Sequence, residues 1–314
     1  DLAAISRITQ LLEGMPLGLE LAAAWVNTLS CQEIMHEISQ SLDFLETSLG
    51  DTSERQRSMR AVFDHSWNLL DNREQVLLPR LAVFRGSFTR QAAEQVVGIS
   101  LRELARLVDQ SLVRRTPLGR FDLHDLLRQY SAEKLERLPA DSQETRRRHC
   151  VYFSARLSEW NKQLSDEKQG QTLREIEAEL ENLQAAWEWA TCQRQFDYLE
   201  QAVDGLCMFY LRRALFTEGR ETCRKANEAI QETASHEDPV QHLRLSTRLL
   251  TWQAALSMNL ERFDEAEQFI QESRRILGNP QLDPQQVNNE KIFALVIQAL
   301  LANLRFDPAA MLEY

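Results

Sequence analysis

Apolar residues recur every three or four positions along most of the chain, and this period predicts amphipathic helices. Strand-like segments are predicted at one place only, Leu112–Arg115 and Arg120–Leu123 on either side of the turn Pro117–Gly119, as a β-hairpin. The predicted helices cover residues 3–12, 16–26, 31–40, 59–70, 73–81, 90–97, 101–110, 124–138, 142–164, 171–193, 196–213, 217–233, 239–260, 264–277 and 284–304.

Local signals support several of these boundaries. Gly14 is expected to end the first helix, and Pro16 fits the first turn of the next one, where its missing N–H costs nothing. Ser30 precedes Glu33 by three positions, which is the spacing of a capping box. Thr89 is expected to cap the helix that follows it, because its hydroxyl can accept from a backbone N–H of the first turn.

The chain is predicted to have three parts. Residues 1–54 form a short helical segment, residues 55–138 combine helices with the hairpin in the manner of a winged helix, and residues 139–314 are helix after helix. Lys and Arg number 1 against 9 Asp and Glu in residues 1–54, 15 against 10 in residues 55–137, and 20 against 28 in residues 138–314. The mildly basic middle part is therefore distinct from its acidic neighbours.

The third part shows weak internal repetition. The segment Arg262–Ala266 recurs as Arg305–Ala309 after 43 residues, and Leu215–Gly219 precedes the first of these by 47 residues. Such periods in helical pairs are typical of an α-solenoid that is similar to tetratricopeptide repeats. The expected fold is thus mainly all-α: a short helical segment, a winged-helix domain with a small β-hairpin, and a tetratricopeptide-like α-solenoid.

Composition excludes several classes of protein. The 43% of hydrophobic residues and only 10 glycines favour a helical globular protein, and a net charge of −11 makes nucleic acid an unlikely partner. The five cysteines form no CxxC pair, which favours a reduced, cytoplasmic setting. No apolar run approaches a membrane span and no signal peptide opens the chain. The abrupt start in a helix leads us to expect a segment of a longer protein.

Catalytic motifs are missing from the sequence. It contains no GxxxxGK[ST] phosphate loop, no GxGxxG, no HExxH and no GxSxG, and its six histidines have no metal-ligand spacing. We therefore expect no enzymatic activity, no catalytic residue, no metal site and no cofactor in this chain.

Three segments in order carry a family resemblance. Gly14–Leu19 is similar to a GLPL motif, Ser58–Leu70 with Leu81–Phe88 looks like the start of a winged helix, and Leu123–Tyr130 stands where an MHD motif would. The set resembles the sensor half of STAND-class signalling ATPases, which include NB-ARC proteins and large bacterial transcription activators with helical repeats. The resemblance covers residues 1 to about 190 well and the rest loosely.

The resemblance implies two nucleotide-contacting residues. In that family the GLPL proline, Pro16 here, packs near the adenine, and the MHD histidine, His124 here, approaches the β-phosphate of ADP. ADP or ATP is expected only together with an upstream P-loop domain. Leu123 stands where the family often has Met. The structural alternative is that Pro16 simply starts a helix and His124 begins one after a strand.

Three functions remain open. The leading one is a regulatory and sensing fragment, in which the winged helix clamps the nucleotide domain and the repeats bind a protein or small-molecule signal. The second is a DNA-binding regulator that uses residues 101–110 as recognition helix, although Glu103 and Asp109 on that helix would face phosphate unfavourably. The third is a free-standing scaffold. The basic residues that support the DNA-binding function are Arg102, Arg106, Arg114, Arg115 and Arg120.

Aromatic side chains of the third part are either surface anchors for a partner or solenoid core. They are Tyr152, Phe153, Trp160, Trp187, Trp189, Tyr210 and Trp252.

Overall fold

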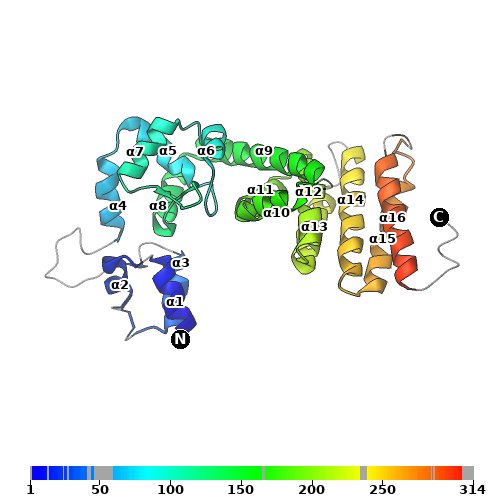
Figure 1. Cartoon of the computed structure of the whole chain (residues 1–314), viewed down its shortest axis with the longest axis horizontal. Coiled ribbons are helices and arrows are strands. Elements are labelled where there is room, and N and C mark those ends of the chain that lie inside the picture. The colour runs from blue at the N-terminus through cyan, green and yellow to red at the C-terminus, as the bar shows by residue number, and fades with distance from the viewer. Residues whose placement is uncertain are drawn as a thin grey trace. The chain divides into compact units, whose positions relative to one another are not determined.

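The computed structural model describes residues 2–12, 14–23, 25–26, 28–40, 44–45, 59–164, 167–233, 239–283, 285 and 287–305 (Figure 1). The chain divides into a first unit, Asp1–His149, and a second unit, Cys150–Tyr314. The first unit holds α1 (Leu2–Leu11), α2 (Pro16–Ala23), α3 (Cys31–Gln40), α4 (Met59–Asn68), α5 (Asn72–Leu81), α6 (Arg90–Val97), α7 (Leu101–Asp109), β1 (Arg114–Arg115), β2 (Phe121–Asp122) and α8 (Asp125–Glu136). The division falls within α9 (Pro139–Gln163), and the second unit continues with α10 (Gln169–Ala178), α11 (Leu180–Cys192), α12 (Phe196–Arg212), α13 (Phe216–Thr233), α14 (Pro239–Met258), α15 (Phe263–Leu277) and α16 (Asn288–Leu304). The mainly all-α prediction is therefore confirmed.

Local caps set the helix starts as predicted. The backbone N–H of Ser30 donates to the Glu33 carboxylate at 2.8 Å, and the Glu33 N–H donates back to the Ser30 hydroxyl at 3.3 Å. Thr89 accepts from the Ala92 N–H at the start of α6. These bonds satisfy backbone donors that the first turn of a helix cannot pair internally.

The middle of the first unit has a helix–turn–helix followed by the hairpin. Gly98 ends α6 with φ 75°, a left-handed conformation that costs glycine little. Strands β1 and β2 pair antiparallel, with Arg115 opposite Phe121. Phe88 and Phe121 form a further bridge through two backbone bonds of 2.8 Å each. The predicted hairpin is confirmed, and it is anchored to the segment between α5 and α6.

Tyr130 of α8 holds α4 in place. Its phenol donates to the Asp64 carboxylate at 2.5 Å, while its ring packs on Phe63 and Trp67. Burial and the neighbouring Asp64 carboxylate raise the pKa of Tyr130, so the phenol stays a neutral donor.

Three turns between helices of the second unit share one backbone geometry. Each contains a non-glycine residue in the left-handed region: Arg194 (φ 55°), Ala214 (φ 56°) and Glu261 (φ 58°). The next N–H donates five residues back, as from Gln195 to the Ala190 carbonyl at 2.8 Å, which defines a Schellman ending. A phenylalanine then starts each following helix: Phe196, Phe216 and Phe263.

The helices of the second unit pack as successive hairpins, and α14, α15 and α16 lie side by side (Figure 1). Phe216 and Phe263, which the sequence repetition aligned, both start second helices of a pair. The third copy, Arg305–Ala309, lies outside the described residues from Phe306 onward.

The prediction of one continuous helix over residues 171–193 is wrong, because the structure has two helices there. The chain bends at Glu179 (φ −108°), between α10 and α11. The Glu179 side chain is buried and accepts a hydrogen bond from the Asn182 amide at 3.0 Å. This side-chain bond lies across the bend, and the apolar period does not reveal it.

Most of the large aromatic side chains of the second unit belong to the core. This outcome favours the core alternative over surface anchors for five of them: Phe153, Trp160, Trp187, Tyr210 and Trp252.

Close packing of α12 on α9 generates the first prediction. A Cβ added at Gly205 would lie 2.5 Å from the Leu157 carbonyl oxygen, which is backbone and cannot move aside. We expect Gly205→Ala to lower the free energy of unfolding by about 2–3 kcal/mol, measured by urea denaturation. Gly170→Ala on α10 is the control, because the nearest atom is the flexible Arg174 Nη1 at 3.9 Å. It should be neutral or stabilise by up to about 1 kcal/mol, and equal effects of the two substitutions would contradict this packing.

Candidate functional site

His124 stands at the N-terminus of α8, directly after β2. Its Nδ1 accepts a hydrogen bond from the Leu126 backbone N–H at 3.1 Å, so the side chain serves as the N-cap. In a neutral imidazole the other nitrogen then carries the proton. The ring is half-buried, and its Nε2 atom, which carries that proton, is itself buried.

Pro16 is the first residue of α2 and is exposed. Gly14 precedes it in a left-handed conformation with φ 72°, which turns the chain from α1 into α2. The start of a helix is the position where proline sacrifices no hydrogen bond. The two residues named by the family resemblance thus lie at the N-termini of two different helices.

A side-chain bond connects the helix that His124 caps to the first three helices. The Gln129 amide lies near two carbonyl oxygens at the end of α3, those of Ile38 at 3.4 Å and Ser39 at 3.3 Å. Carbonyls at a helix C-terminus have no partner within the helix. Within the first unit, α8 is therefore joined to α3.

Several basic side chains around α7 and the hairpin have partners in the same unit. Arg106 lies 3.2 Å from Asp71, and Arg114 lies 2.7 Å from Asp122. The Arg120 guanidinium donates twice to Ser87, at 2.8 Å each. Exposed Arg102 and Arg115 make no ion pair with the described residues. Two of the five arginines predicted for a DNA-facing surface, Arg106 and Arg114, are thus paired with carboxylates of the same unit.

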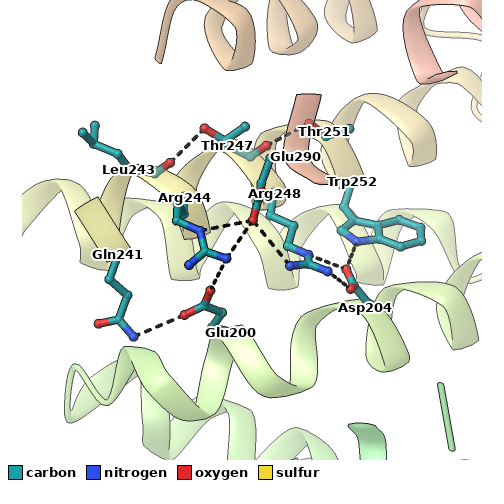
Figure 2. Close-up of polar contacts among 10 residues, drawn as sticks. All are labelled: Glu200, Asp204, Gln241, Leu243, Arg244, Thr247, Arg248, Thr251, Trp252 and Glu290. Atoms are coloured by element: carbon teal, nitrogen blue, oxygen red, sulfur yellow. Dashed lines mark hydrogen bonds and ion pairs between the residues drawn. The ribbon is translucent and has the colours of Figure 1, made fainter. Parts of the chain in front are cut away.

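A network of charged side chains joins α12, α14 and α16 of the second unit (Figure 2). Asp204 on α12 accepts from Arg248 Nε and from Trp252 Nε1, both at 2.9 Å, and its second oxygen also accepts from Arg248. Burial lowers the pKa of Arg248, but the hydrogen bond and charge of Asp204 raise it, and the net shift is upward. The guanidinium is therefore held charged between two helices.

Glu290 on α16 completes this network. Its side chain is only 1% exposed, and its Oε1 lies 3.2 Å from Arg244 and 3.7 Å from Arg248. Arg244 also lies 3.4 Å from Glu200 on α12. The second oxygen of Glu290 is buried and makes no hydrogen bond with the described residues. Two guanidiniums thus stabilise one buried carboxylate (Figure 2).

The network follows the repeat period. Arg248 comes 44 residues after Asp204, Gln241 comes 44 residues after Asp197, and Glu290 comes 46 residues after Arg244. These separations match the number of residues in one helix pair. The contacts therefore join corresponding positions of two neighbouring helix pairs.

Sequence reasoning missed this network, although a signal for it exists. Arg244, Arg248 and Trp252 recur every four residues and therefore share one face of α14. Glu200 and Asp204 show the same spacing on α12. Polar residues on one face of an otherwise buried helix indicate partners on a neighbouring helix.

Among the described residues no group of His, Cys, Asp and Glu is arranged to hold a metal ion. Within those same parts of the chain, every helix is too short or too polar to cross a lipid bilayer.

Comparison with known proteins finds relatives that are much longer than this chain. No family model matches. Proteins of Mycobacterium bovis and Mycobacterium tuberculosis that are provisionally named HTH-type transcriptional regulators are 33% identical over 229 residues, covering 69% of this chain and 25% of each relative. An uncharacterised Mycobacterium tuberculosis protein is 34% identical over 144 residues, covering 42% of this chain and 36% of the relative. The chain thus spans about a quarter of the length of its first curated relatives.

One solved structure is loosely similar. It is a signal transduction ATPase with numerous domains and a tetratricopeptide repeat sensor from Pyrococcus horikoshii, with a TM-score of 0.36 and 16% identity. The match covers 90% of this chain and 43% of that one.

The charged network generates the second prediction. We expect Glu290→Ala to lower the free energy of unfolding by about 2 kcal/mol, because Arg244 and Arg248 lose their shared buried partner but keep Glu200 and Asp204. Urea denaturation followed by circular dichroism measures the change.

Glu272→Ala is the matched control for this prediction. Glu272 pairs with Arg275 at 2.6 Å on the surface of α15, where such pairs contribute about 0.5 kcal/mol or less. If Glu290→Ala costs no more than Glu272→Ala, the network is not a stabilising element.

Proposed function

We propose that this chain is the regulatory and sensing part of a STAND-type signal-transduction ATPase whose output is transcription. In this proposal the helix–turn–helix and hairpin of the first unit act as a winged helix that closes over an upstream nucleotide domain. The helical pairs of the second unit receive a protein or small-molecule signal. The chain itself has no catalytic role, and its partners are protein or domain surfaces.

The geometry of His124 carries the proposal. Capping α8 engages Nδ1, so the proton of the neutral ring lies on Nε2, the tautomer that a hydrogen bond to a phosphate oxygen requires. Nε2 is buried in this structure, so the proposed contact requires the residues that cover it to move aside. A hydrogen bond to a charged phosphate contributes about 1.5–3 kcal/mol. That energy is enough to shift a two-state clamp by roughly 10- to 100-fold.

Two further observations support it. The Gln129 amide joins the helix capped by His124 to α3, which follows the GLPL-like segment in the same unit. The curated relatives of this chain are named as transcriptional regulators, which favours a transcriptional output.

The substitution His124→Asp tests the clamp without removing the cap. Aspartate is one of the preferred N-cap residues and can accept the same backbone hydrogen bond. We therefore expect the free energy of unfolding of the first unit to stay unchanged. Aspartate cannot donate to phosphate and repels it. In the native-length protein that contains this chain, we expect His124→Asp to lower ADP affinity by at least about tenfold, measured by isothermal titration.

His65→Asp is the control, because it makes the same charge change on an exposed residue of α4. It should leave ADP affinity unchanged. ADP affinity that is equal in wild type and His124→Asp, or a native-length protein without a P-loop, would refute the clamp.

A second candidate function is DNA binding by α7 and the hairpin. Two observations favour it: the relatives are named as HTH-type regulators, and the exposed guanidiniums of Arg102 and Arg115 make no ion pair with the described residues. The ion pairs of Arg106 and Arg114 oppose it.

Fluorescence anisotropy with duplex DNA over a range of salt concentrations separates the two functions. We expect no specific binding by this chain near physiological salt, because its net charge is −11 and Arg106 and Arg114 are already paired with carboxylates. Tight binding whose salt slope falls by about 1 for each of Arg102→Ala and Arg115→Ala would instead establish the DNA-binding function.

A further inference from the structure

A cavity of about 350 Å³ opens between α11, α12 and α13 of the second unit. This volume lies in the range of small-molecule sites. Two aromatic residues and a leucine line it together with polar and charged residues of α11 and α13, namely Gln184, Glu188, Thr191, Cys192, Glu221, Thr222 and Lys225.

Trp187, Leu206 and Tyr210 line the cavity but are largely covered by other atoms, and Trp187 keeps the most accessible surface of the three, 7%. Burial raises the pKa of Tyr210, and the Gln184 amide donates to its phenolic oxygen at 3.3 Å, so the phenol stays uncharged. The Trp187 ring is therefore the apolar surface of the cavity against which a flat apolar group can lie.

The edge carries opposite charges on two different helices. Glu188 of α11 is exposed and has no ion pair with the described residues. Lys225 of α13 lies 3.9 Å from Glu221, but Arg224 holds that carboxylate more closely, at 2.6 Å. A carboxylate and an ammonium group are thus both available to a ligand beside the Trp187 ring.

We propose that this cavity binds a small zwitterion with an aromatic side chain, that is, a free aromatic amino acid or a molecule with the same three groups. Its ammonium group pairs with Glu188, its carboxylate pairs with Lys225, and its ring lies against Trp187. The role of this ligand as a signal rests on the proposed sensor function of the second unit. Binding itself does not depend on that function.

The charges argue against other ligand classes. A phosphorylated ligand would meet both Glu188 and Glu221 at the edge of the cavity. A hydrocarbon would make no ion pair with Glu188 or Lys225. A zwitterion with a ring pairs with both residues and also contacts Trp187.

Calorimetric titration of the chain with three probes tests the proposal. L-phenylalanine has all three groups, 2-phenylethylamine lacks the carboxylate, and 3-phenylpropionate lacks the ammonium. We expect L-phenylalanine to bind about tenfold more tightly than either truncated probe, because each loses one charge-assisted bond.

Substitutions of the two charged residues at the edge of the cavity test each proposed ion pair separately and leave the buried core unchanged. Glu188→Gln should weaken L-phenylalanine about tenfold and leave 3-phenylpropionate unchanged, because that probe has no ammonium. Lys225→Gln should weaken L-phenylalanine similarly and leave 2-phenylethylamine unchanged. Glu181→Gln, on the exposed start of α11 outside the cavity, should change nothing.

Two outcomes overturn the proposal. One is the absence of saturable binding of L-phenylalanine to the folded chain. The other is equal binding of all three probes, which would mark an apolar cavity without zwitterion selectivity. Because none of these titrations involves nucleotide, their failure is separate from failure of the His124 clamp, which ADP affinity measures.

Discussion

The buried carboxylate of Glu290, held by Arg244 and Arg248, limits how the helices of the second unit can align. The hydrophobic effect is not directional, so burial alone does not fix the position of α14 along its neighbours, although most of that helix is buried. A buried charge has no such freedom, because losing its partners costs several kcal/mol. Since the same guanidiniums also face Glu200 and Asp204, α12, α14 and α16 satisfy their charges in one alignment only.

In the first unit the His124 side chain caps a helix and is also the residue on which the proposed nucleotide switch depends. His124 completes the start of α8, and the same bond fixes which ring nitrogen carries the proton. The donor is thus oriented by the fold before any phosphate arrives. Preorganisation of this kind reduces the cost of binding.

The sequence predicted best what is decided locally. Ser30, Thr89 and Pro16 identify helix starts because a cap depends on residues within one turn. The bend at Glu179 was missed because a side-chain bond, and not the apolar period, accompanies it. The partners of Arg248 were missed because they lie on helices that only the fold brings together. The left-handed turns at Arg194, Ala214 and Glu261 were missed because none contains the glycine that usually indicates such a turn.

The 44-residue spacing of the charged network restricts how the length of this chain can change during evolution. One residue inserted into α14 before Arg244 would rotate the rest of that helix by about 100° relative to its start. The Arg244 and Arg248 guanidiniums would then face away from α12 and α16. Insertions and deletions compatible with the network must therefore fall in the connections between helices. A search for repeats of constant length would accordingly fail here, although the helix pairs themselves are aligned with one another.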